Sequence, residues 1–412
     1  MNTTDESLRI RFATEEDWQA VYENQARAYG VSVEAPDVEA WKRRVNLEDI
    51  LVAEDVTDPQ EPFLVGTSLY YRLRLTVPGG ASLEAGWLAM IAVAATHQGR
   101  GVWQQLSIRG FGILMDRGYS ILCGVPTQPT VYEILGAGVA SYSRTYNLEP
   151  RFTELRTKPG RTRAREVDAS QARRHLPDIY ERWCAVTHGA LSRQSGWWDD
   201  YLEDRVSQRD NASALNFIIH PDGFLTYRVT GASPHSFRRP FGDAIIQDFC
   251  PITDEAHTEL LAALMGLKMF DNIVIEVPVD DPLPLKLKDP LATQTTGLSD
   301  FLWMRIMNVP EVLSAREYWA DIDVVLEVTD PLGVAGGVFR LQTRDGVGTC
   351  TPHDGPPDIT IGLADLGTIY MGAHRAVELH RASRITELRS GALRQLDAAC
   401  NTERAPYCGT LF

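Results

Sequence analysis

Residues 91–106, IAVAATHQGRGVWQQL, pass from a β-rich pattern to a helical one through a corner that holds two glycines and an arginine. The small and β-branched residues up to Val93 are typical of a strand. Beyond the corner, apolar residues recur at helical spacing until Gly118, which predicts a helix with a glycine C-cap. A strand that passes directly into a helix predicts a mixed α/β unit for this part of the chain.

The corner itself is a candidate anion site. A helix N-terminus offers unpaired N–H groups and about half a positive charge, and glycines let a pyrophosphate approach the backbone. The residues concerned are Gln98, Gly99, Arg100, Gly101 and Val102. A tight turn without a ligand is the other interpretation, and the local sequence alone does not separate the two.

The length of the chain, 412 residues, exceeds one ordinary core, and we expect three units. The first, residues 1–150, is predicted as a strand, a helix, a meander of antiparallel strands and the strand-to-helix corner. A strand at 119–125 and a short helix at 129–135 follow.

The second unit, residues 151–298, repeats this order of elements with little likeness in residues. A helix at 169–188 precedes a hairpin, and a strand at 244–251 leads into another helix. The corresponding corner carries the carboxylates Asp254 and Glu255, which suit a helix dipole but would repel a phosphate. If the second unit is a copy of the first, we expect it to have lost the anion site.

The third unit, residues 299–412, is predicted as an α+β sheet with helices on one face. Its first strand is expected at 301–308, and further strands alternate polar and apolar residues between turns. Helices are predicted at 309–320, 363–371 and 374–398. The chain as a whole therefore combines α/β and α+β architecture.

The charge of the chain restricts its partners. Its 55 acidic and 40 basic side chains give a formal net charge of −15, which repels phosphate backbones and anionic membranes. Nucleic acid and membrane surfaces are therefore not expected as partners. The same field attracts cationic small molecules, although it is also the ordinary solubilising charge of many enzymes.

Cysteine usage and hydropathy point to an intracellular protein without metal. The six cysteines are scattered, with no CxxC pair and no histidine at zinc-ligand spacing, so we interpret them as reduced core thiols. The N-terminus lacks an apolar signal core, and no apolar run reaches the roughly 18 residues that span a bilayer. We expect a cytoplasmic location.

The corner resembles a known signature. AVAATHQGRGVWQQL is similar to the Gln/Arg-x-x-Gly-x-Gly/Ala pattern that binds acetyl-CoA in the GNAT acyltransferase superfamily. Gln98 and Gly101 match this pattern, whereas Trp103 stands where the superfamily has Gly or Ala.

A closer resemblance covers nearly the whole chain. It is similar to the Enhanced intracellular survival (Eis) family of aminoglycoside-type N-acetyltransferases, on the segment VYEILGAGVAS and a second unit of GNAT outline without the signature. The segments VTDPLGVAGGVFRL and PDITIGLADLGTIYMGAHRAVEL resemble sterol carrier proteins, and the chain ends APYCGTLF. The resemblance implies tandem GNAT-like domains, the second degenerate, a sterol-carrier-protein-like domain, and a hexameric assembly.

The resemblance also implies acetyl-CoA as co-substrate and no metal. The fourth strand would pair with the pantetheine arm, and the corner would hold the pyrophosphate. The expected cofactor contacts are Ile91, Ala92, Val93, Gln98, Gly99, Arg100, Gly101, Val102 and Thr127.

Two residues are expected to carry the chemistry. Tyr132 stands where the family places its general acid, and a phenol of pKa about 10 is matched to a thiol near 8.5. The alternative is a purely structural tyrosine. The family's base is the chain's own terminal carboxylate, here that of Phe412, with an unperturbed pKa of about 3.3 to 3.7. Such a group needs burial or a relaying water to act as a base, and the ending Leu411-Phe412 has no charged tail.

The sequence is compatible with two classes of acceptor amine. The family receives polycationic aminoglycosides in an acidic pocket, but here Leu411 is penultimate and no acid occurs between Tyr29 and Glu34. An aminoglycoside and a less charged aminated natural product both stay open, with Tyr29, Trp41 and Leu411 expected at the acceptor site. His97 is expected to face solvent or phosphate.

Two alternatives to this function stay open. The chain could be a non-catalytic carrier of acyl-CoA or lipid, because its third unit resembles lipid-binding folds. It could also transfer a different acyl group, since Trp103 changes the signature.

Overall fold

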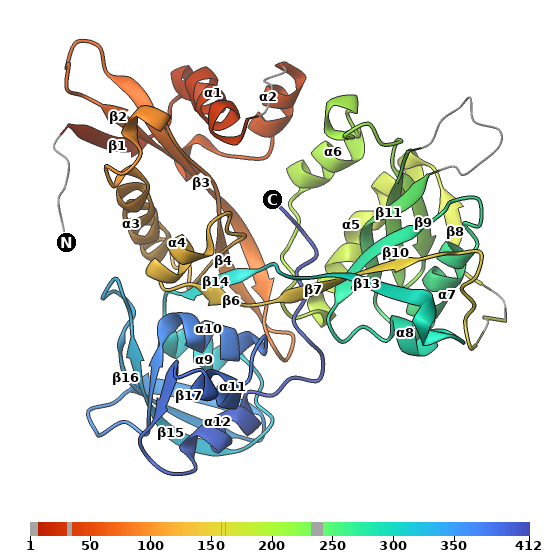
Figure 1. Ribbon diagram of the computed structural model, residues 1–412. Coiled ribbons are helices and arrows are strands. Elements are labelled where there is room, and N and C mark those ends of the chain that lie inside the picture. Colours follow the sequence, from red (N-terminus) through yellow and green to blue (C-terminus); the bar gives the residue numbers. More distant parts are fainter. Residues whose placement is uncertain (1–6, 31–34, 158, 161, 232–241) are drawn as a thin grey trace.

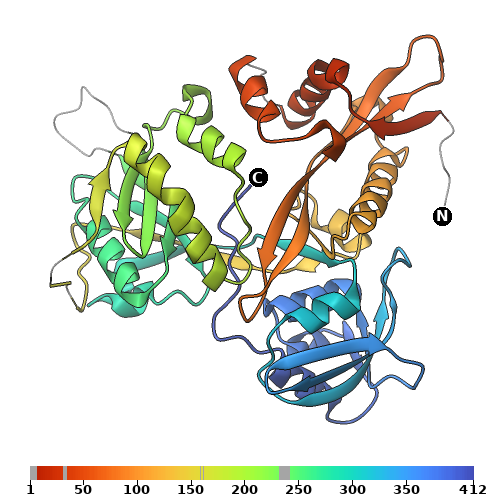
Figure 2. The same ribbon diagram turned by 180° about the vertical axis from the view of Figure 1, so that it is seen from behind.

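Three β-sheets with packed helices make up the part of the chain that the computed structural model describes, residues 7–30, 35–157, 159–160, 162–231 and 242–412. The first sheet (mostly red to gold, with β14 in cyan) and the second (mostly yellow to turquoise) stand side by side, and the third (blue) lies at the base of the first (Figures 1 and 2). The C-terminus ends between the first two sheets. The predicted combination of α/β and α+β architecture is confirmed.

The first sheet has helices on both faces. Its strand order is β1-β2-β3-β4-β5-β14-β6. Val52 of β2 packs in one core with Val21 of α1, whereas its neighbour Ala53 packs in another core with Leu106 of α3. The elements are β1 (Leu8–Phe12), α1 (Trp18–Tyr29), α2 (Ala35–Lys42), β2 (Ile50–Asp55), β3 (Phe63–Thr76), β4 (Ser82–Val93), α3 (Val102–Asp116), β5 (Ile121–Gly124), α4 (Pro129–Ile134), β6 (Gly138–Val139) and β14 (Trp303–Ile306).

The second sheet repeats the two-faced arrangement. Its strand order is β13-β7-β12-β11-β10-β9-β8. Phe224 of β10 packs in the core with Leu176 of α5, and the next residue, Leu225, packs in the core with Leu260 of α7. The elements are β7 (Tyr142–Leu148), β8 (Arg165–Val167), α5 (Ala169–Val186), α6 (Ser195–Glu203), β9 (Asn216–His220), β10 (Gly223–Thr230), β11 (Asp243–Pro251), α7 (Asp254–Met265), β12 (Ile273–Pro278), α8 (Leu283–Lys286) and β13 (Thr293–Asp300).

The third sheet, in the order β17-β16-β15-β18-β19, buries one face against helices. Val324, Leu326 and Val328 of β15 are buried, whereas Asp323 and Thr329 are exposed. The elements are α9 (Val309–Ala315), β15 (Ile322–Thr329), β16 (Gly337–Arg344), β17 (Val347–Pro352), β18 (Ile359–Gly362), α10 (Leu363–Met371), α11 (Ala376–Arg381), β19 (Ile385–Glu387) and α12 (Ala392–Ala399).

Two elements differ from the sequence-based expectation. The single helix predicted at 374–398 is wrong: the chain turns at Ser383, whose φ is +60°, and β19 pairs with β18 between α11 and α12. The strand expected to open the third sheet at 301–308 is instead β14, which lies between β5 and β6 of the first sheet. Its pairing partners lie far away in the sequence, so no local pattern reveals them.

The interior of the described chain agrees with the interpretation of its cysteines. All six are buried and free. Within the described residues, no helix is long and apolar enough to cross a membrane. The same residues contain no group of three or more His, Cys, Asp or Glu side chains arranged to hold a metal ion.

Candidate active site

The first sheet opens between β4 and β5. These two strands pair in parallel from Ala85 to Trp87 of β4, and the register given for the pair ends at Trp87 opposite Cys123. Beyond this point β4 bends, because its ladder with β3 shifts register and Met90 adopts a φ of +51°. Residues 91–93 therefore diverge from β5, and among the described strands none pairs with their β5 side.

The strand-to-helix corner directly follows this opening. Gly99 and Gly101 adopt φ values of +77° and +75°, a left-handed conformation that residues with a β-carbon disfavour. The Gln98 side chain donates a hydrogen bond of 2.9 Å to the carbonyl of Val93, which closes the corner. Since α3 begins at Val102, its first N–H groups have no partner within the helix. The backbone here suits a phosphate group.

His97 fastens the corner to the sheet. Its side chain is buried, at 5% exposure, and Nε2 lies 2.9 Å from a carboxylate oxygen of Asp55 in β2. This hydrogen bond lowers the pKa of Asp55 below its ordinary value. The expectation that His97 faces solvent or phosphate is therefore wrong. Arg100 is exposed at the corner and donates to the hydroxyl of Ser7 at 2.7 Å.

Tyr132 reaches the opening from α4. A β-carbon at Gly124 would lie 2.7 Å from the Tyr132 hydroxyl and 3.2 Å from the carbonyl oxygen of Leu88, so this hydroxyl lies where β5 ends beside β4. The ring packs edge-on against Trp303 of β14, with centroids 6.2 Å apart. Burial raises the pKa of Tyr132 well above its ordinary value, which keeps the phenol protonated.

Helix α1 holds the diverging part of β4 from the other side. Asn24 donates to the carbonyl of Ala92 at 3.3 Å, and Gln25 donates to the carbonyl of Met90. Tyr29, predicted at the acceptor site, donates to the carbonyl of Ile91 at 3.3 Å. Tyr29 thus lies at the strand edge that was predicted to bind pantetheine.

The last residue packs against the same opening. The ring of Phe412 lies 5.3 Å from that of Trp87 in β4, 6.0 Å from Tyr71 in β3 and 6.3 Å from Trp197 in α6. Phe412 is partly buried on the core shared with α1, whereas Tyr132 packs on the core of α3. The two residues therefore flank the β4–β5 opening from opposite faces of the sheet.

The remaining predicted residues are more dispersed. Trp41 is 7% exposed and packs between Trp18 and Tyr22, with centroids at 5.5 and 5.8 Å, so it supports the site from the core rather than lining it. Leu411 is 64% exposed at the edge of a cavity of about 330 Å³. Thr127 is exposed in the bend between β5 and α4.

Sequence reasoning missed two contributors. Gly124 leaves the space that the Tyr132 hydroxyl occupies, and Arg44 lines a small cavity together with Phe412 and Tyr71. Neither carries a motif, because the space beside Gly124 exists only once α4 folds back on β5, and Arg44 is distant from Phe412 in the sequence.

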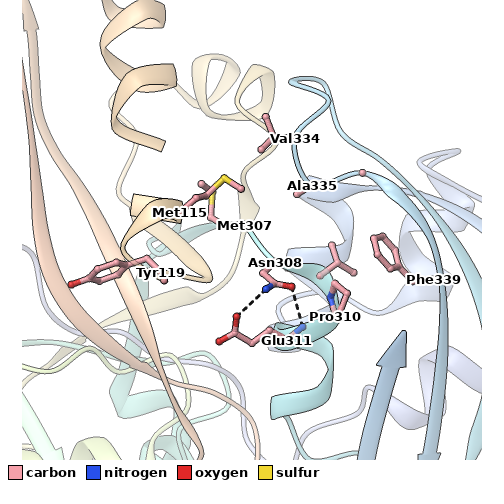
Figure 3. Close-up of a pocket in the computed structure, with 12 residues that line it drawn as sticks. Met115, Tyr119, Met307, Asn308, Pro310, Glu311, Val334, Ala335 and Phe339 are labelled. Atoms are coloured by element: carbon pink, nitrogen blue, oxygen red, sulfur yellow. Dashed lines mark hydrogen bonds between the residues drawn. The ribbon is translucent and has the colours of Figure 1, made fainter. Parts of the chain in front are cut away.

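A second cavity lies apart from these residues, between the end of α3 and the third sheet (Figure 3). Its volume is about 280 Å³, and Met115, Met307 and Phe339 line it with Asn308 and Glu311. Asn308 and Glu311 bond to each other at the start of α9. None of the predicted site residues lines this cavity, and we interpret it as a joint between the first and third sheets.

Comparison with known proteins agrees with this geometry. Residues 9–140 and 189–306 each match an Acetyltransferase (GNAT) domain family, and residues 309–409 match the Sterol carrier protein domain. N-acetyltransferase Eis from Mycobacterium tuberculosis is 33% identical over 394 residues, which cover 94% of this chain and 95% of that protein. The chain belongs to the Eis family of N-acetyltransferases.

Two further likenesses extend over most of the chain. The crystal structure of Eis1 from Mycobacterium abscessus superposes with a TM-score of 0.87 at 28% identity, covering 98% of this chain and 100% of that one. An uncharacterized N-acetyltransferase from Streptomyces griseus is 28% identical, covering 84% of this chain and 86% of that protein.

Membership of the Eis family establishes this chain as an acetyltransferase, which excludes a purely non-catalytic carrier. The second GNAT match ends at residue 306, so it includes β14. The second GNAT-like half of this Eis-family chain therefore contributes a strand to the sheet of the first half.

Proposed function

We propose that this acetyltransferase moves the acetyl group of acetyl-CoA directly to a primary amine of a small molecule in a ternary complex. Tyr132 acts as the general acid and the carboxylate of Phe412 as the general base. One observation carries the proposal: these two residues flank the β4–β5 opening from opposite faces. A thioester in the opening would lie between them.

The cofactor contacts follow from the open strand and the corner. The backbone groups of Ile91 and Val93 would pair with the pantetheine amides once Tyr29 releases the Ile91 carbonyl and Gln98 releases the Val93 carbonyl. The first turn of α3 and the two left-handed glycines would receive the pyrophosphate. A backbone N–H of β4 would donate to the thioester oxygen as negative charge develops there.

The reaction then needs two proton transfers. The neutral amine nitrogen attacks the thioester carbon and gives a proton to the Phe412 carboxylate, directly or through a water. The carbon–sulfur bond breaks, and the leaving sulfur takes a proton from the Tyr132 hydroxyl. A phenol is protonated at neutral pH, as a general acid must be before transfer.

The acceptor is an amine that packs on the partly exposed rings of Trp197 and Phe412. Trp87, Tyr71 and Trp197 surround Phe412, and the guanidinium of Arg44 lies 5.5 Å from the Tyr71 ring centroid. Arg44 pairs with Asp200 at 2.8 Å, which leaves this wall without strong net charge. An aminoglycoside and a less charged aminated natural product both fit this description.

The acid is tested by Tyr132→Phe. We expect kcat to fall by roughly 10²-fold, because a positioned general acid contributes about that factor. The KM for acetyl-CoA should change little, since the corner is untouched. Tyr119→Phe, in the connection between α3 and β5 and outside the opening, is the matched control. Thioester consumption with a panel of amines provides the measurement, and unchanged kcat in Tyr132→Phe would reject the assignment.

The base is tested by adding two residues after Phe412. This change moves the terminal carboxylate away and should nearly abolish turnover while acetyl-CoA still binds. The same two residues added before Met1 form the control. Normal turnover in the C-terminally extended protein would exclude the terminal carboxylate as base.

A further inference from the structure

A short connection in the second unit joins the first sheet to the end of the chain. We call residues 187–194, between α5 and α6, the strap, and residues 405–412 the tail. On one side the strap pairs with β3: Gly189 donates to the carbonyl of Thr76 at 2.8 Å, and Ser192 donates to that of Arg74 at 2.9 Å. The strap is therefore fixed to the strand that neighbours β4.

The other side of the strap holds the tail. Tyr407 donates its backbone N–H to the carbonyl of His188 at 3.0 Å. Arg193 donates to the hydroxyl oxygen of Thr410 from Nη2 at 2.8 Å and from Nε at 3.1 Å. Thr410 is 2% exposed, so both hydrogen bonds are shielded from water.

Arg193 is itself rigidly held. Its guanidinium lies 4.0 Å from the ring centroid of Trp197 and 4.1 Å from that of Tyr180. Its Nη2 also pairs with Asp248 of β11 at 2.5 Å, and both side chains are 2% exposed. Burying a guanidinium costs desolvation free energy, which its hydrogen-bond and ion-pair partners must offset. The hydroxyl of Thr410 in the tail is one of these partners of Arg193.

Because the chain is continuous, the contact between Arg193 and Thr410 limits how far the Phe412 carboxylate can move. From Thr410, the two remaining residues span at most about 7 Å. Without that contact, the nearest fully buried tail residue is Cys408, and the four residues after it span about 14 Å. The volume open to the terminal carboxylate would grow roughly eightfold, in proportion to the cube of this reach.

We infer that Arg193 is a positioning residue for acetyl transfer: by binding Thr410 it fixes the Phe412 carboxylate at the β4–β5 opening. This inference rests on the proposed role of Phe412 as base. It also gives the second, signature-free GNAT-like unit a task, because α6, β11 and the strap together hold the tail.

The test uses Thr410→Val, which removes the hydroxyl and with it the hydrogen bonds to Arg193 and Tyr180, but keeps the shape and the Arg193–Asp248 pair. We expect kcat to fall by roughly tenfold through the lower local concentration of the base, with an unchanged KM for acetyl-CoA. Thr410→Ser, which keeps the hydroxyl, should restore kcat. Thr153→Val, which loses a single buried hydroxyl hydrogen bond, is the control and should leave kcat unchanged.

A second readout does not depend on turnover. Release of Phe412 by a carboxypeptidase, followed by mass spectrometry, should be roughly tenfold faster in Thr410→Val than in the natural protein or in Thr410→Ser. Equal trimming rates in all three proteins, or equal losses of kcat in the Val and Ser variants, would overturn the inference. If extension beyond Phe412 leaves turnover normal, the base assignment fails instead, while trimming still reports on the Arg193 contact.

Discussion

At the scale of single residues, the missing side chain of Gly124 decides where the Tyr132 hydroxyl lies. A methyl group there would approach this hydroxyl to 2.7 Å, and the Leu88 carbonyl at 3.2 Å blocks the backbone from yielding. Gly124→Ala should therefore displace the phenol and lower kcat by about tenfold or more, since small misplacements of reacting groups are costly.

The same variant offers a coupling test. In a Tyr132→Phe background the closest clashing atom, the hydroxyl, is gone and only a ring carbon at 3.1 Å remains, so Gly124→Ala should cost clearly less than it does alone. Gly112→Ala in α3, where an added methyl meets open space, is the control for kinetics and folding. Strict additivity of the two changes in steady-state kcat would show that Gly124 does not act through the phenol.

His188 in the strap makes stability depend on pH. Burial, reinforced by Arg316 and Arg404, lowers the pKa of its side chain to about 4. Protonation therefore favours the unfolded chain, whose histidine has a pKa of about 6.5. The stability that neutral His188 contributes is complete above pH 6.5 or so and is lost as the pH falls toward 4.

The variant His188→Asn removes this dependence. Urea unfolding between pH 7 and pH 4 should show the natural protein losing up to about 3 kcal/mol more than the variant over that range. His175→Asn, exposed on the preceding helix α5, should show the same pH profile of unfolding as the natural protein. Parallel pH profiles for His188→Asn and the natural protein would contradict the expectation.

At the scale of elements, β14 depends on a buried ion pair with the third unit. Arg305 of β14 and Asp330 are both 0% exposed and lie 2.8 Å apart. Burial alone would raise the pKa of Asp330, but hydrogen bonds from Arg305 and from backbone groups outweigh it and hold this pKa at about 2. Arg305→Met leaves that carboxylate without its cation and should lower the free energy of unfolding by about 3–5 kcal/mol.

The control for this prediction is an exposed pair. Arg340 and Asp323 lie 2.5 Å apart with 42% and 48% of their side chains exposed, and Arg340→Met should lower the free energy of unfolding far less than Arg305→Met. Urea unfolding followed by tryptophan fluorescence measures both variants. Comparable losses in the two would show that the Arg305 pair does not secure β14.

The sequence predicted those elements whose stabilising contacts lie within one continuous stretch of the chain. The corner from Val93 to Val102 and the helix that follows it lie in one continuous stretch, and the predicted order of strand, turn and helix is confirmed. The partner of β14 could not be predicted from local patterns, because Ile306 pairs with Ile121, which is far away in the sequence. The contact of Arg193 with Thr410 spans a similar distance and leaves no motif.

At the scale of the whole molecule, the formal net charge of −15 acts differently on the two substrates. Acetyl-CoA carries phosphates and approaches a repelling field, whereas a polycationic amine approaches an attracting one. Raising the ionic strength from about 0.01 to 0.1 M shortens the Debye length from roughly 30 to 10 Å, which screens both effects.

This contrast separates the two acceptor classes. For a polycationic aminoglycoside, kcat/KM should fall by about tenfold over that range, because steered association weakens as salt rises. For a monoamine of similar size kcat/KM should change little, and the KM for acetyl-CoA should fall slightly. Initial rates at four salt concentrations, with each acceptor in turn, provide the measurement. An identical salt response for the two amines would show that the molecular field plays no part in choosing the acceptor, and that the aromatic wall around Phe412 alone selects it.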